Sequence, residues 1–133
     1  MLAAVADTHA VIWYIFGDTR ISAKAQKTID EAARNGRYVG ISTMTLAEIF
    51  YLNEIKRIAS DTLSRLITLL RDPENVLTEI PIDSGIVESM IHIPRQDIPD
   101  LPDRVIAATA LSLGVPIITR DRKIQAANLQ SLW

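Results

Sequence analysis

Four acidic side chains stand where a short apolar stretch ends or where a segment with helical spacing begins. They are Asp7, Glu48, Asp103 and Asp121. Carboxylate oxygens are the ligands that Mg²⁺ and Mn²⁺ prefer, and such an ion with open water positions suits the hydrolysis of phosphodiester bonds. The chain has no cysteine and only two histidines, so a zinc site is disfavoured. The residue types therefore favour a hard divalent cation, provided that the fold brings the four carboxylates together.

Each of these acids also has a purely structural explanation. Asp7 and Asp121 precede helical segments and are good N-caps. Asp103 would lie in a first helical turn, where the macrodipole favours a carboxylate by roughly 0.3–1 kcal/mol, and Glu48 would form a capping box with Thr45. Taken singly, each acid is better explained as a cap. Convergence of all four would favour a metal ion, because uncompensated carboxylates repel one another.

The order of the apolar segments predicts an arrangement that brings the acids together. Short strands are expected at residues 3–6, 38–42, 76–82 and 117–119, with a fifth near Leu132. Amphipathic helices are expected between them, from Thr8 onward and then over about 22–35, 45–57, 60–72, 83–92 and 103–113. This alternation predicts a parallel sheet with helices on both faces. Ligands of such sheets bind outside the carboxyl ends of the strands, which is where the four acids fall.

Length and composition bound the class of protein. The 133 residues suffice for one domain with a sizeable core, which we take as residues 1–133. With 48% apolar and 23% charged residues, a disordered chain and a coiled coil are disfavoured. The N-terminal apolar run ends at Asp7, too short for a signal peptide or membrane span, which together with the absence of cysteine predicts a cytoplasmic protein. The net charge of −2 means that binding to a nucleic acid would need a local basic rim.

Several stretches of the chain form one joint pattern. They are Asp7-Thr8-His9 followed by AVIW, RIS at 20–22, ISTMTLAEI around Glu48, DRVIAATAL from Asp103, and PIITRD ending at Asp121. Together they resemble the PIN-domain ribonucleases of the VapC toxin family, and the match runs in order over nearly the whole chain. It implies a PIN-like three-layer α/β/α fold with a central parallel sheet of four to five strands, in which the four acids bind Mg²⁺ or Mn²⁺.

The resemblance also implies a function. The expected protein is a metal-dependent endoribonuclease that cleaves single-stranded RNA by metal-activated water, with no need for a protein base. It would be the toxin of a VapBC-type toxin–antitoxin system, a homodimer, and bound by a small cognate antitoxin. Two alternatives stay open: a catalytically silent PIN-like module that binds RNA or protein, and a phosphoacceptor receiver domain. The receiver is disfavoured because one acid, Asp7, follows the first strand where that class needs two.

Residues beside the four acids are candidates for supporting roles. Thr119 and Thr8 are placed to hydrogen-bond ligands or metal-bound water, or are ordinary turn hydroxyls. Asp100 is a candidate accessory ligand, although the proline that follows it in many relatives is replaced here by Leu101. His9 is assigned no role.

Basic and aromatic side chains also occur near the acids in the sequence. The candidates for RNA phosphate contacts are Arg104, Arg120, Arg122 and Lys123. Salt bridges or a solvated face explain these four residues about as well. The aromatic residues of the first helical segment, Trp13, Tyr14 and Phe16, are expected in the core or in a dimer contact.

Overall fold

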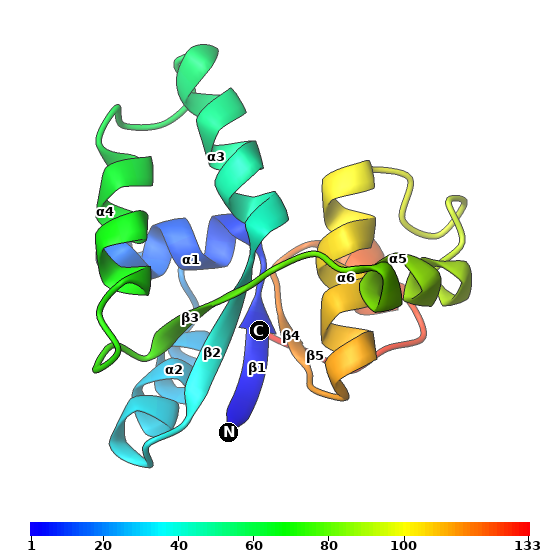
Figure 1. The fold of residues 1–133 in the computed structure, drawn as a ribbon, viewed down its shortest axis with the longest axis horizontal. Helices are drawn as coiled ribbons and strands as arrows, with labels where there is room; N and C mark the ends of the chain where they lie inside the picture. The colour runs from blue at the N-terminus through cyan, green and yellow to red at the C-terminus, as the bar shows by residue number, and fades with distance from the viewer.

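A computed structural model of the chain describes all 133 residues and is built around one five-stranded sheet. The strands are β1 (Leu2–Ala6), β2 (Tyr38–Ser42), β3 (Leu77–Ile80), β4 (Ile117–Ile118) and β5 (Ser131–Leu132). Their order is β3-β2-β1-β4-β5 and every neighbouring pair is parallel (Figure 1). The prediction of a parallel sheet with a short fifth strand is confirmed. Pro81 directly follows β3, an edge strand, where its missing N–H costs no ladder bond.

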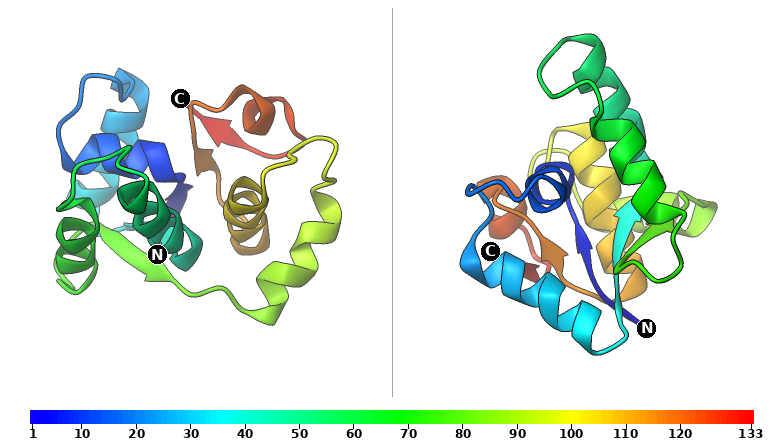
Figure 2. Two further views of the ribbon diagram at one scale, coloured as in Figure 1. Left: turned by 90° about the horizontal axis from the view of Figure 1, so that it is seen from above. Right: turned by 90° about the vertical axis from the view of Figure 1, so that its left-hand side faces the viewer.

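Helices cover both faces of this sheet. One group consists of α1 (Thr8–Ile15), α2 (Ala23–Arg34), α3 (Thr43–Glu54) and α4 (Thr62–Leu70). The other group consists of α5 (Ser84–Ser89), the 3₁₀ turn η1 (Met90–His92), α6 (Leu101–Leu113) and α7 (Arg122–Ala126). Figure 2 shows the two groups on opposite sides of the strands, as the sequence predicts for a three-layer α/β/α fold. No helix combines the length and the apolar character that crossing a membrane requires.

Two apolar cores lie on the two faces, and β1 contributes to both. Successive side chains of a strand point to opposite faces. Ala4 and Ala6 accordingly join the core beneath α1 to α4, while Val5 joins the core beneath α5 to α7. Because β1 is packed on both sides, its carboxyl end is held rigidly at the centre of the sheet.

The helix that carries Glu48 begins earlier than the sequence predicts. Helix α3 starts at Thr43 because Ser42 is its N-cap, accepting from the backbone N–H of Met44 at 3.0 Å. The predicted capping box of Thr45 and Glu48 is therefore wrong. Thr45 lies inside the helix, fully buried, and its hydroxyl is free to contact a neighbouring element.

The helix that carries Asp103 also begins earlier than expected. Helix α6 starts at Leu101, since the side chain of Asp100 caps it by accepting from the backbone N–H of Asp103 at 3.0 Å. Pro102 occupies the first turn, where its missing N–H leaves no hydrogen bond unmade. Asp103 thus lies in the first turn of α6, not at its opening residue.

Candidate active site

The first acid lies where β1 and β4 end side by side. The parallel register pairs Ala6 with Ile118, so the next side chains along each strand, Asp7 and Thr119, come together. The hydroxyl of Thr119 donates to Oδ2 of Asp7, whose Oδ1 accepts from the backbone N–H of Ala10 at 3.0 Å. Asp7 is only 7% exposed, and burial raises its pKa, while these two hydrogen bonds act in the opposite direction.

The same threonine also positions Asp121. Oγ1 of Thr119 accepts from the backbone N–H of Asp121 at 2.9 Å. The carboxylate of Asp121 caps α7, with Oδ1 accepting from the N–H groups of Lys123 at 2.8 Å and Ile124 at 3.1 Å. One buried hydroxyl therefore contacts the carboxylate of Asp7 and the backbone of Asp121 at the carboxyl edge of the sheet. For both acids the predicted capping role is confirmed, and it coexists with their position at a shared site.

Glu48 is held from a different helix. The hydroxyl of Thr8, at the start of α1, donates to Oε1 of Glu48. The same hydroxyl lies 3.1 Å from Oγ1 of Thr45, and both threonines are buried. The pair of hydroxyls between α1 and α3 thus orients a glutamate that its own helix would leave free to rotate.

The pKa of Asp103 reflects both its partial burial and the negative charges of the neighbouring acids. Its pKa is raised to about 7, first by partial burial and then by the negative charges of Asp100, Asp121, Glu48 and Asp7. Burial and neighbouring negative charges both disfavour the ionised form of a carboxyl group, and both act on Asp103. None of the ion pairs in the structure involves any of the four acids.

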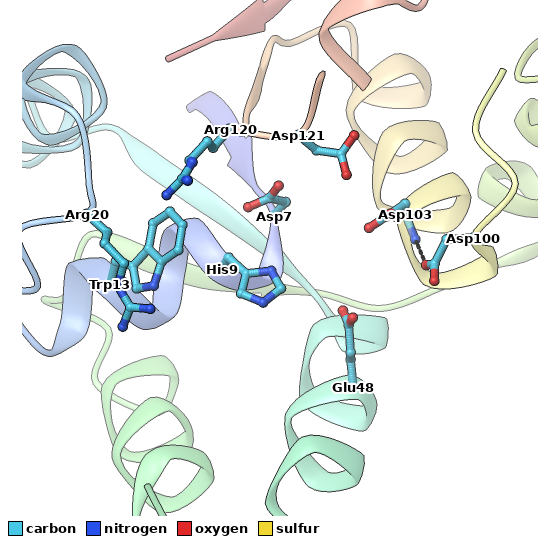
Figure 3. Close-up of a pocket in the computed structure, with 9 residues that line it drawn as sticks. All are labelled: Asp7, His9, Trp13, Arg20, Glu48, Asp100, Asp103, Arg120 and Asp121. Atoms are coloured by element: carbon cyan, nitrogen blue, oxygen red, sulfur yellow. Dashed lines mark hydrogen bonds between the residues drawn. The ribbon is translucent and has the colours of Figure 1, made fainter. Parts of the chain in front are cut away.

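The four acids line one open cavity of about 610 Å³. Its lining residues are Asp7, His9, Trp13, Arg20, Glu48, Asp100, Asp103, Arg120 and Asp121. Figure 3 shows Asp103, Asp100 and Asp121 at one side of this cavity and Trp13 with Arg20 at the other, with Asp7 and His9 between them. Parallel strand ends and helix starts thus bring together acids that lie far apart in the sequence.

The donor set of the cavity fits a hard divalent cation. Every carboxylate offers oxygen, and no cysteine exists to compete. In the structure no three acidic or histidine side chains are already close enough to enclose an ion. Mg²⁺ suits this open arrangement because it retains several waters and does not require a closed protein cage. Asp7, Glu48, Asp103 and Asp121 are the residues that would hold the ion, and Asp100 lines the cavity beside them.

The basic residues singled out from the sequence lie in different places. Arg120 lines the cavity, whereas Arg122 and Lys123 are exposed on α7 and do not line it. Arg104 points away, because its Nε donates to the carbonyl of Ile93 at 3.0 Å. Its Nη2 also lies 3.5 Å from the carbonyl of Met90, so the guanidinium anchors the segment after α5. Arg104 therefore has a structural role that the sequence analysis missed.

Two further residues of the cavity were not predicted as part of a site. Trp13 packs in the core as expected, being 7% exposed, yet its ring also forms a wall of the cavity. The guanidinium of Arg20 lies 5.2 Å from the centre of this ring and that of Arg120 lies 5.4 Å from it. Nothing in the local sequence pattern indicates these contacts, since they join α1 to two separate loops.

The chain is similar in sequence and in fold to known proteins. The PIN domain family model matches residues 4–128, nearly the whole chain. The chain is 27% identical over 128 residues to Ribonuclease VapC22 of Mycobacterium tuberculosis, covering 95% of this chain and 92% of that protein. It superimposes on VapBC2 from Rickettsia felis, solved with a promoter DNA fragment, with a TM-score of 0.72 at 17% identity and 98% coverage of both chains.

A second solved structure gives the same result. The chain superimposes on a toxin–antitoxin complex from Klebsiella pneumoniae with a TM-score of 0.65 at 22% identity, over 98% of this chain and 97% of the other. At these identities the solved structures establish the shared fold. The resemblance to VapC-type PIN domains and the PIN-like fold, both predicted from the sequence, are confirmed.

Proposed function

Because the chain belongs to the PIN domain family, we propose that it is a metal-dependent endoribonuclease and the toxin of a toxin–antitoxin pair. The observation that carries this proposal is the convergence of four carboxylates from separate parts of the chain on one open cavity. Partial burial, and then the negative charges of the neighbouring acids, raise the pKa of Asp103, and none of the four acids takes part in an ion pair. A divalent cation, Mg²⁺ or Mn²⁺, is the partner whose charge and ligand preference match the cluster.

RNA is the proposed substrate, and the cytoplasm is the proposed site of action. The name of the 27% identical relative, a ribonuclease, supports this choice. The cavity itself supports a phosphodiester substrate, since Arg20 and Arg120 stand at its rim beside the acids. Guanidinium groups there can donate to phosphate oxygens of the substrate.

In the proposed hydrolysis, different residues of the chain bind the metal ion, orient its ligands and position the phosphate. A bound ion would neutralise phosphate charge and lower the pKa of a coordinated water. The acids supply its oxygen ligands, and Thr119 and Thr8 keep the carboxylates of Asp7 and Glu48 from turning away. Arg120 positions the phosphate from the rim. No histidine or lysine need act as a base, and His9 remains without an assigned role.

The proposed partners are an antitoxin and a second copy of the chain. One of the similar solved structures is a toxin–antitoxin complex from Klebsiella pneumoniae and the other is VapBC2 from Rickettsia felis, which supports an antitoxin. The large apolar side chains of Phe50 and Tyr51 on α3 are 55% and 58% exposed. Exposed aromatic side chains at one place on a helix support a protein-binding surface there.

The test is cleavage of a defined single-stranded RNA by purified protein in Mg²⁺, in Mn²⁺ and in EDTA. We expect cutting with metal, none in EDTA, and none from an Asp121→Asn variant. The matched control is Asp97→Asn, an exposed aspartate outside the cavity, which should cut as wild type does.

Two results would contradict the proposal. Cutting by Asp121→Asn at the wild-type rate would indicate a contaminating nuclease or a different site. A protein that cuts no RNA and shows no thermal shift with either metal would favour the alternative, a catalytically silent module that binds RNA or protein.

A further inference from the structure

A second cavity adjoins the acidic one and has the opposite charge. It measures about 470 Å³ and lies where the end of α1 meets the loop between α3 and α4. Three cations line it, Arg20, Lys56 and Arg57, against one carboxylate, Asp18. Arg20 lines both cavities, so the basic one continues directly from the acidic one.

Arg20 is held in a fixed orientation between the two cavities. Its Nε donates to Oδ1 of Asp18 at 3.1 Å and its Nη2 to Oδ2 at 2.8 Å, which occupies one edge of the guanidinium. The centre of the guanidinium lies 5.2 Å from the centre of the Trp13 ring. Asp18 occupies Nε and Nη2 of Arg20, and the Trp13 ring lies against the face of the guanidinium. The other terminal nitrogen, Nη1, can therefore donate to another group. In Figure 3, Arg20 and Trp13 lie on the side of the cavity opposite Asp103.

Lys56 and Arg57 occupy a turn that glycine would form more easily. Helix α3 ends in a Schellman motif, in which the N–H of Lys56 bonds the carbonyl of Asn53 at 3.0 Å and that of Arg57 bonds Leu52 at 2.9 Å. The residue in the left-handed conformation of this motif is usually glycine, yet here it is Lys56, with φ of 57°. It is the one residue other than glycine with positive φ in the chain. The left-handed conformation is unfavourable for lysine, and at this turn Lys56 and Arg57 both line the second cavity.

The two loop cations have no partner within the protein. The ion pairs of the structure join Arg20 to Asp18, Lys27 to Glu31 and Arg65 to Asp61. Lys56 and Arg57 take part in none of them and are exposed. With Asp18 offset by Arg20, the basic cavity therefore retains two unpaired positive charges on a chain whose net charge is −2.

We propose that this basic cavity, lined by Arg20, Lys56 and Arg57, binds backbone phosphates of the single-stranded RNA next to the segment held at the acids. The inference rests on the proposed nuclease function, because the RNA must enter the acidic cavity. The acids alone would repel the polyanionic RNA. The basic cavity adjoins the acidic one through Arg20, so its cations can bind the RNA backbone next to the acids. Contacts to phosphates position the strand and carry no sequence preference.

The test compares RNA binding by two double variants that remove equal charge. In Lys56→Gly/Arg57→Gln, glycine also relieves the left-handed strain at residue 56, so we expect this variant to fold at least as stably as its parent, which its melting temperature checks. The control, Arg34→Gln/Arg71→Gln, removes cations that precede β2 and β3, at the opposite edge of the sheet. All proteins carry Asp7→Asn to prevent cleavage. The probe is a fluorescein-labelled single-stranded RNA of mixed sequence, about 12 nucleotides long, followed by anisotropy at several salt concentrations.

The expected result is a dissociation constant about tenfold higher for Lys56→Gly/Arg57→Gln, with the control unchanged. The slope of log affinity against log salt should become shallower by roughly 1.4, since each phosphate contact to a single strand contributes about 0.7. Equal losses in both variants, or an unchanged slope, would overturn the proposal. If the unmodified chain cuts RNA while Lys56→Gly/Arg57→Gln binds normally, the nuclease stands and this cavity serves another partner. If the Asp7→Asn protein binds no RNA at all, this inference fails regardless of the cleavage assay.

Discussion

The hydroxyl of Thr119, at the end of β4, donates a hydrogen bond to Asp7, at the end of β1, although the two residues are 112 positions apart in the sequence. The same oxygen accepts from the backbone N–H of Asp121 at 2.9 Å. Two of the four acids are therefore positioned by one buried side chain that has no charge of its own. Substitution of Thr119 therefore tests how the positions of Asp7 and Asp121 depend on a side chain that is not itself an acid.

Replacing Thr119 by valine keeps the shape of the side chain and removes the hydroxyl. Because Asp7 then loses a donor and the Asp121 N–H an acceptor, we expect the free energy of unfolding to fall by about 1–3 kcal/mol. Affinity for Mn²⁺, measured by calorimetry, should fall 10- to 100-fold, as for other groups that orient metal ligands. Thr119→Ser retains the hydroxyl and should recover most of both quantities. Equal Mn²⁺ affinity in the valine and serine variants would contradict this role.

Replacing Thr8 by valine tests the support of Glu48. The variant removes the donor to Oε1 and leaves the Thr45 hydroxyl facing a methyl group. We expect kcat/KM for RNA cleavage to fall about tenfold, with a loss of roughly 1 kcal/mol in stability. The serine variant is again the matched control. A valine variant with normal kcat/KM would show that Glu48 orients itself without help.

The raised pKa of Asp103 predicts how the stability of the metal-free protein depends on pH. The folded protein keeps this proton up to a pKa of about 7, whereas the usual value is 3.8. Protonation therefore favours the folded state, and the free energy of unfolding falls as pH rises between these two values. We expect Asp103→Asn, which carries no charge, to raise the melting temperature in EDTA at pH 8 and to leave it nearly unchanged at pH 4. Parallel curves for wild type and variant would contradict the assignment.

Metal binding should stabilise the protein by relieving the same repulsion. At a Mn²⁺ concentration 100 times the dissociation constant, the gain is about 2.7 kcal/mol, or a rise of roughly 10 °C in melting temperature for a chain of this size. Glu48→Gln should lose most of the rise in a thermal-shift assay with and without EDTA. The control Asp97→Asn, outside the cavity, should keep it. An equal rise in all three proteins would place the metal elsewhere.

We expect substitution of Arg104 to lower the free energy of unfolding and to leave the affinity for RNA unchanged. Its guanidinium donates to the carbonyl of Ile93 at 3.0 Å and lies beside that of Met90. We expect Arg104→Gln to lower the free energy of unfolding by about 1–2 kcal/mol in urea titrations, because a buried carbonyl loses its donor. RNA affinity of the folded variant should match wild type. The exposed Arg122→Gln serves as the comparison, with unchanged stability.

The amino-acid sequence by itself determined the order of strands and helices and the parallel sheet. Apolar runs separated by helical periods allow few other arrangements, and parallel strands bring their carboxyl ends to one edge. Placing Asp7, Glu48, Asp103 and Asp121 at a common edge followed from this topology alone. The predicted starts of α3 and α6 were two residues late, because Ser42 and Asp100 turned out to be the caps.

The tertiary structure decided which side chains meet across that edge. Thr119 reaches Asp7 because the register pairs Ala6 with Ile118, and a shift by one residue would turn each side chain to the other face. Arg104 contacts the carbonyls of Ile93 and Met90, and Arg20 lines two cavities of opposite charge. The periodicity of apolar residues indicates which face of a helix or strand is buried. It does not indicate which other helix or strand packs against that face.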